Sequence, residues 1–252
     1  MTKNPEIFDD LPADLQTEAE LGEWLHTYLT GEYGNETEAW ATERVCRISR
    51  RLNEVRAACP IRGVCPHDLQ VEILWIGAMN AFALPGSYVY ITRELLQQAD
   101  ADEPFALVIA HEMAHHDLGH TRILRGSLSQ IRHASAFVVG AFLNCMGRRF
   151  IGPENESAAD SYALDLCIAA GYDGKRCLEL YTILEAYAVD HRDLDGVFGT
   201  DESLTNIPPG EFRDVRAWLQ SVRGWTWQRL RGYPSLRERR TSLTVQLNEY
   251  GA

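Results

Sequence analysis

The stretch HEMAHHDLGH, residues 111–120, constrains this chain more than any other part of its sequence. In an α-helix, residues four positions apart lie only about 40° apart around the axis. His111 and His115 therefore project from one face, at a separation that lets two ring nitrogens close around one metal ion. Glu112 lies about 60° from His115, where it can reach a water on that metal without taking a ligand position. The segment EPFALVIA just before it supplies the apolar turns that bury such a helix.

The other two histidines of this stretch fail the same geometric test. His116 is rotated about 100° from His115, and His120 about 140°, if the helix continues. We therefore expect His116 and His120 at the surface or behind a ligand, and not on the metal. An amphipathic helix that happens to carry two histidines is the alternative interpretation. A third ligand would decide the matter, because catalytic zinc usually has three protein ligands and one open position.

A third ligand is available in the segment ENESAADSYALDLCIAAGYD, which has the pattern of a helix ending near Gly171. Glu156 and Asp160 are four residues apart and share a face. One carboxylate can bind the metal while the other accepts the free N–H of a ligand histidine, which fixes the tautomer of that histidine. Spacing alone does not choose Glu156 over Glu154. Two solvated acids on a surface helix are the alternative.

The pattern along the chain predicts an α+β fold, mainly helical, with one small sheet. Residues 69–92 are rich in β-branched and aromatic residues, with a turn at Pro85-Gly86, and predict a mostly antiparallel sheet beside the histidine helix. Residues 190–210 form a long polar loop, and such loops are usually functional or mobile. Helical patterns cover 14–30, 36–58, 93–99, 103–119, 121–146, 155–170, 174–189, 210–230 and 234–248.

Two units are expected along the chain. Residues 1–60 would form an N-terminal helical extension that packs on or covers a metal-binding unit of residues 61–252. One continuous domain is the alternative. The second helix of the extension carries a fair amphipathic stripe, made of Trp40, Val45, Ile48 and Leu52.

Composition bounds the class of protein. The 252 residues carry a formal net charge of -12, which argues against a nucleic-acid partner. The first residues show no basic region followed by an apolar one, so we expect no secretory signal and a cytoplasmic location. The most apolar run, residues 134–146, is shorter than the roughly 20 residues that span a bilayer.

We expect free thiols, with Cys59 and Cys65 in an ordinary loop; a disulfide or a small metal knuckle is the alternative there.

Three blocks of the sequence resemble peptidase family M48, in the gluzincin group, and they occur in the family's order. NAFALPGSYVYITRELL, residues 80–96, resembles the family's strand-turn-strand, and HEMAHHDLGH resembles its zinc helix. ESAAD, residues 156–160, resembles its ExxAD block. A weaker fourth block, YPSLRER at residues 233–239, is similar to the family's HPxxxxR element. The chain looks like one of the small soluble members, which lack spanning helices.

The resemblance implies a zincin fold of the gluzincin type with one zinc ion per chain. His111, His115 and Glu156 would be its ligands. Asp160 would support a ligand histidine, and Arg239 falls where it could pair with Asp160.

These residues predict a zinc metalloendopeptidase. Glu112 would act as general base on a water activated by the metal. Tyr233 replaces a family histidine thought to lie near the scissile carbonyl; its hydroxyl could steady an oxyanion, or it could serve only in packing. The substrate would be an extended polypeptide that adds as a strand along Asn80, Ala81, Phe82 and Ala83. The alternatives are a latent or regulatory binding protein of the same fold, with its cleft blocked, and a zinc hydrolase of non-peptide amides.

Overall fold

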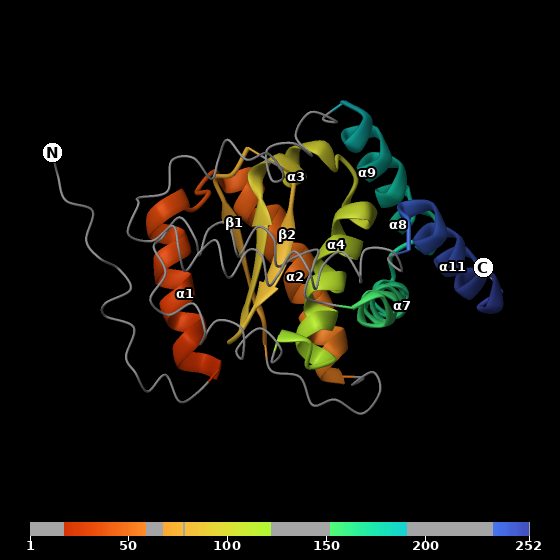
Figure 1. The fold of residues 1–252 in the computed structure, drawn as a ribbon, viewed down its shortest axis with the longest axis horizontal. Helices are drawn as coiled ribbons and strands as arrows, with labels where there is room; N and C mark the ends of the chain where they lie inside the picture. Colours follow the sequence, from red (N-terminus) through yellow and green to blue (C-terminus); the bar gives the residue numbers. More distant parts are fainter. Residues whose placement is uncertain (1–17, 59–67, 78, 122–151, 191–233, 252) are drawn as a thin grey trace, which may run out of the picture.

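The computed structural model describes residues 18–58, 68–77, 79–121, 152–190 and 234–251 (Figure 1). The elements in chain order are α1 (Glu18–Tyr33), α2 (Ala39–Ala58), β1 (Gln70–Leu74), β2 (Ala81–Leu84), β3 (Tyr88–Thr92), α3 (Arg93–Gln98), α4 (Asp102–Asp117), α7 (Pro153–Ala169), α8 (Gly174–Cys177), α9 (Glu179–Asp190) and α11 (Leu236–Glu249). The predicted range 174–189 holds two helices, α8 and α9, which separate at Leu178. The helices predicted over 121–146 and 210–230, and the loop 190–210, lie outside the described residues.

The three strands form one mixed sheet in the order β1-β3-β2. β2 and β3 pair antiparallel across the turn at Pro85-Gly86, but β1 pairs with β3 in parallel. The prediction of a mostly antiparallel sheet is therefore wrong for β1. β3 takes the central position and is buried at all five of its residues. The chain thus forms the two edge strands, β1 and β2, first and then places β3 between them.

Alternate residues of β3 face two different layers. Val89 and Ile91 belong to the hydrophobic core that includes residues of α2 and α4, whereas the ring of Tyr88 stacks on His26 of α1 with 4.3 Å between centroids. This alternation follows from the two-residue period of a strand. α1 therefore covers one face of the sheet, and α2 and α4 lie on the other, with α7 on the far side of α4 (Figure 1).

α2 contributes to the same core as the later helices. Val45, Ile48 and Leu52 are buried in it. Trp40, the fourth member of the predicted stripe, is 46% exposed, and its indole N–H donates to Glu38. α2 thus shares its core with the later helices, and the division of the chain into one unit or two, with a boundary near residue 60, stays a prediction.

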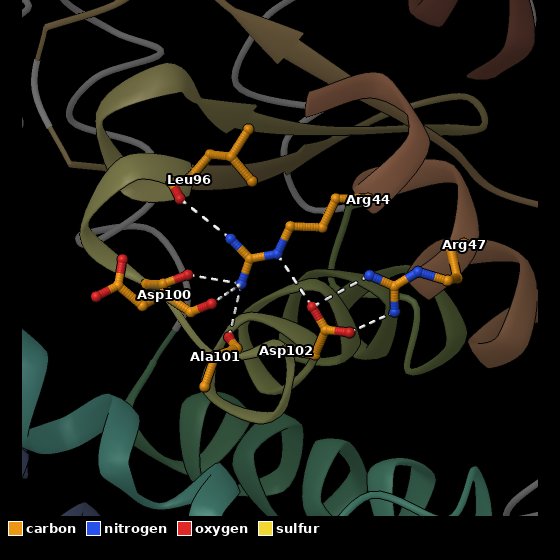
Figure 2. A network of polar contacts seen from close by, with 7 residues as sticks. Arg44, Arg47, Leu96, Asp100, Ala101 and Asp102 are labelled. Carbon is orange, nitrogen blue, oxygen red and sulfur yellow. Dashed lines mark hydrogen bonds and ion pairs between the residues drawn. The ribbon is translucent and has the colours of Figure 1, made fainter. Parts of the chain in front are cut away.

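Arg44 of α2 anchors the turn that leads into α4 (Figure 2). Its guanidinium donates to the carbonyl oxygens of Ala99 and Ala101, at 2.6 and 2.7 Å. Its Nε donates to Asp102 Oδ1, at 3.1 Å, at the first residue of α4. Carbonyl groups at the end of a helix have no partner within it. Arg44 supplies partners for the carbonyls that follow α3 and so helps to place the start of α4.

Among the described helices, none is both long and apolar enough to cross a membrane. The apolar run 134–146 lies outside the described residues, as do Cys59 and Cys65. The described cysteines are free thiols: Cys46, Cys167 and Cys177.

Candidate metal centre

Two packed helices carry the residues of the candidate metal centre. α4 is buried along nearly its whole length, because the sheet covers one side of it and α7 covers another. α7 begins at Pro153, whose fixed φ suits the first turn of a helix. Glu156 follows in that turn. The packing of α7 on α4 therefore brings the Glu156 carboxylate against the two histidines.

Three potential ligand atoms converge between these helices. His111 Nε2 and His115 Nε2 lie 3.1 Å apart, and the two carboxylate oxygens of Glu156 lie 3.4 and 3.6 Å from them. Tetrahedral zinc, with ligand bonds of about 2.0–2.2 Å, holds its ligand atoms roughly 3.3–3.6 Å apart. Glu156 Oε1 is buried and receives no hydrogen bond from the part of the chain that the structure describes. The spacing and this unsatisfied oxygen both fit a bound zinc ion.

The structure distinguishes Glu156 from Glu154 as a possible metal ligand, which spacing in the sequence could not do. Glu156 is only 3% exposed and lies beside the histidines, whereas Glu154 is exposed. Residues two positions apart point about 200° apart around a helix. When Glu156 faces α4, Glu154 therefore faces away from it.

Asp160 supports His111 from the next turn of α7. Its Oδ1 lies 3.0 Å from His111 Nδ1, and Arg239 of α11 donates to both of its oxygens, each at 2.6 Å. The pair of Asp160 and Arg239 that the sequence suggested is thus present. Burial raises the pKa of Asp160, but the hydrogen bonds from Arg239 and the close contact with His111 outweigh burial and hold this pKa at about 2. The guanidinium of Arg239 in turn lies over the ring of Tyr181 of α9, with 5.8 Å between its carbon and the ring centroid.

The electrostatics of the cluster favour a cation. Burial lowers the pKa of His111, but its close contacts with the carboxylates of Asp160 and Glu156 outweigh burial and raise this pKa to about 10. Two carboxylates therefore draw positive charge to His111, as a proton or as a metal ion. Burial lowers the pKa of His115 well below its usual value, which keeps its ring neutral. A neutral imidazole has a lone pair free for a metal.

Glu112 lies beside this cluster of three ligands and is not a member of it. It is 8% exposed, and burial, together with the nearby Glu156 carboxylate, raises its pKa to about 7. The nearby backbone of Ala83 in β2 acts in the opposite direction on the pKa of Glu112 and partly offsets this rise. Glu112 therefore lies between the ligand cluster and an outer strand of the sheet.

β2, which contains three of the four residues predicted to meet a substrate, is an edge strand of the described sheet. The N–H of Thr92 donates to the carbonyl of Asn80, at 3.0 Å. Bonded and non-bonded pairs alternate along antiparallel strands. By this alternation, the backbone groups of Phe82 face β3, and those of Ala81 and Ala83 face the outer edge.

One residue beside the candidate site, Tyr181, escapes prediction from sequence. Tyr181 carries no signal, because it lies on a separate helix with no fixed spacing from Asp160.

His120 lies behind a ligand, one of its two expected places: it is buried, and its Nδ1 is 2.9 Å from His115 Nδ1. Tyr233, predicted near the scissile bond, lies outside the described residues. The sequence feature that could have placed His120 behind the ligand is Gly119, because a glycine with positive φ ends the helix and turns the chain just before His120.

A comparison with known families agrees with this site. The model of Peptidase family M48 matches residues 49–239, more than half of the chain, and this range includes the whole ligand cluster. A candidate metal site inside a peptidase family match marks the protein as a metallopeptidase. The chain belongs to peptidase family M48. A search of curated proteins finds no match to the chain.

Proposed function

We propose that the protein is a zinc-dependent endopeptidase in which His111, His115 and Glu156 hold one zinc ion. The observation that carries this proposal is the convergence of their ligand atoms within 4.8 Å of one another. Two imidazoles and one carboxylate form a donor set of catalytic zinc sites, which keep a fourth position open. A site built only for structure has no use for the buried acid at Glu112.

Residues of the chain have the other roles in the proposed hydrolysis. When bound, zinc supplies a Lewis acid for a peptide carbonyl and lowers the pKa of a water to about 7. Glu112 accepts the proton of that water on a carboxylate oxygen and returns it to the nitrogen of the leaving amine. Asp160, held by Arg239, keeps the ring of His111 in one orientation. Tyr233 is proposed to donate its hydroxyl hydrogen to the oxyanion.

An extended polypeptide is the proposed substrate. The backbone groups of Ala81 and Ala83 face the outer edge of β2, where a substrate strand would add, as in other cases of strand addition. The substrate's hydrogen bond with the Ala81 N–H would replace the one that Asn80 Oδ1 accepts, at 3.0 Å. The backbone contact of Ala83 with Glu112 supports this placement, because it puts the edge of β2 next to the proposed general base. Because the substrate would be recognised through its backbone, along Asn80 to Ala83, the enzyme should select only weakly among substrate side chains.

The test compares three single variants with the wild type. Zinc content is measured by elemental analysis, and hydrolysis of casein is measured with and without a chelator. Glu112→Gln should keep one zinc per chain and lose hydrolysis by about 100-fold or more, the usual contribution of a general base. Glu156→Ala should lose both zinc and hydrolysis. Glu154→Ala, which removes the exposed acid two residues earlier, should keep both.

The same experiment distinguishes the alternative, a latent or regulatory binding protein. A wild-type chain that binds one zinc ion and leaves casein intact would support that alternative. A Glu112→Gln variant that hydrolyses casein at the wild-type rate would contradict the proposed role of this residue.

A further inference from the structure

His120 is brought to the metal centre by the way α4 ends. The amide of Gly119 donates to the carbonyl of His116, at 2.9 Å, and the amide of His120 donates to the carbonyl of His115, at 2.8 Å. Gly119 has a positive φ of 75°. These two bonds and the left-handed glycine form a Schellman motif, which reverses the chain direction at a helix end. His120 is therefore not where a continued helix would place it.

This reversal puts the ring of His120 against the back of a ligand. His120 is 7% exposed, and its Nδ1 lies 2.9 Å from His115 Nδ1. The opposite nitrogen of His115, Nε2, faces His111 and Glu156. The two nitrogens of the His115 ring thus have different partners: one faces the proposed metal position and the other faces His120.

The chemistry of imidazole then determines the direction of this hydrogen bond. A ligand nitrogen must present its lone pair, so a neutral His115 that binds metal through Nε2 carries its hydrogen on Nδ1. That N–H can only donate, and the atom 2.9 Å away is His120 Nδ1. His120 therefore accepts through Nδ1 and carries its own hydrogen on Nε2.

We infer that His120 is a positioning residue, which holds His115 in the tautomer and orientation that zinc requires. This inference rests on the zinc site proposed above. The two ligand histidines then have different supports: a carboxylate, Asp160, behind His111, and a neutral imidazole behind His115. Partners of this kind commonly change metal affinity by about 10–100-fold when they are removed.

The test measures zinc affinity by competition with a chromophoric chelator, so it does not depend on proteolysis. His120→Phe keeps a ring of similar shape and removes the acceptor, and we expect zinc to bind about 10–100-fold more weakly. His120→Asn places an amide oxygen near the position of Nδ1 and should restore most of the affinity. His116→Phe is the matched control, because the ring of His116 bonds to the carbonyl of Tyr88 in β3, and it should leave zinc affinity unchanged.

A second measurement needs no variant that could fail to fold. Long-range proton–nitrogen correlation spectra of the zinc-loaded wild type should show His120 as the neutral tautomer with its hydrogen on Nε2. A His120→Phe protein that folds and binds zinc as tightly as the wild type would overturn the inference, and so would a hydrogen on His120 Nδ1. A wild type that binds no zinc would overturn the proposed function and, with it, this inference. Tight zinc binding without hydrolysis would overturn only the proposed function.

Discussion

Arg56 of α2 forms a buried ion pair with Asp117, the last residue of α4. Its Nε and Nη2 donate to the two carboxylate oxygens, at 2.8 and 2.5 Å, and the side chains are only 1% and 3% exposed. Tyr162 of α7 donates to the same carboxylate. This network therefore joins three helices of the core, and its loss should destabilise the whole domain.

The expected size of the effect follows from this geometry. Replacing Arg56 by alanine removes two hydrogen bonds to a charged group, each worth about 1.5–3 kcal/mol, and leaves Asp117 buried without a counter-charge. Removing one partner of a buried ion pair typically destabilises a protein by about 3–5 kcal/mol. We therefore expect Arg56→Ala to lower the free energy of unfolding by about 4 kcal/mol. That is a large share of the roughly 5–15 kcal/mol of a typical domain.

The assay is equilibrium unfolding in urea, followed by circular dichroism, with a chelator in every sample so that metal binding does not contribute. Arg47→Ala is the matched control on the same helix. Arg47 also pairs with an aspartate, Asp102, but its side chain is 60% exposed. Exposed pairs contribute about 0–1 kcal/mol, so this variant should unfold almost as the wild type does.

A double variant tests the stated cause. Replacing Asp117 by asparagine in an Arg56→Met protein removes the uncompensated charge and keeps an acceptor for Tyr162. It should recover roughly 2 kcal/mol relative to Arg56→Met alone. The reasoning is refuted if Arg56→Ala and Arg47→Ala lose equal stability, or if the second substitution recovers nothing.

Two further predictions concern α1 and the metal. A Cβ atom at Gly22 would lie 2.5 Å from the carbonyl oxygen of Pro85, whereas Gly31 on the same helix faces open space. Gly22→Ala should therefore destabilise the fold by about 1–3 kcal/mol, and Gly31→Ala should stabilise it by about 0.5–1 kcal/mol; equal shifts in the thermal unfolding midpoint would contradict this close contact. Chelation should lower the thermal unfolding midpoint of the zinc-loaded wild type by roughly 10 °C. The reason is that free zinc at about 1,000 times its Kd adds about 4 kcal/mol to the free energy of unfolding. Chelation should not change the midpoint of Glu156→Ala, and an equal shift in both proteins would place the zinc elsewhere.

Much of the candidate site could be predicted because its chemistry is local. His111 and His115 lie one turn apart on one helix, and so do Glu156 and Asp160, and helix geometry alone determines that each pair shares a face. The same rule placed His120 off the metal, which the structure bears out, but it could not choose between the surface and a position behind a ligand. The rule assumes that the helix continues, whereas α4 ends at Asp117 and Gly119 then turns the chain back towards His115.

The order of the strands and the packing of α2 depended on segments that are distant in sequence. The strand pattern of residues 69–92 predicted strands correctly, but the pattern is the same for parallel and antiparallel neighbours. The parallel pairing of β1 with β3 was therefore not predictable from it. Likewise, the apolar stripe of α2 showed that this helix buries one face and did not show against which elements.

By itself, the sequence determined which side chains stand together on each helix, and hence that a pair of imidazoles and a pair of carboxylates were available for a metal site. The tertiary structure alone decided that Glu156 lies against the histidines while Glu154 is exposed, and that His120 lies behind His115 and not at the surface. The physical reason is that backbone geometry relates near neighbours through fixed rotations. Contacts between helices depend on how whole surfaces pack, and no spacing within one segment specifies that.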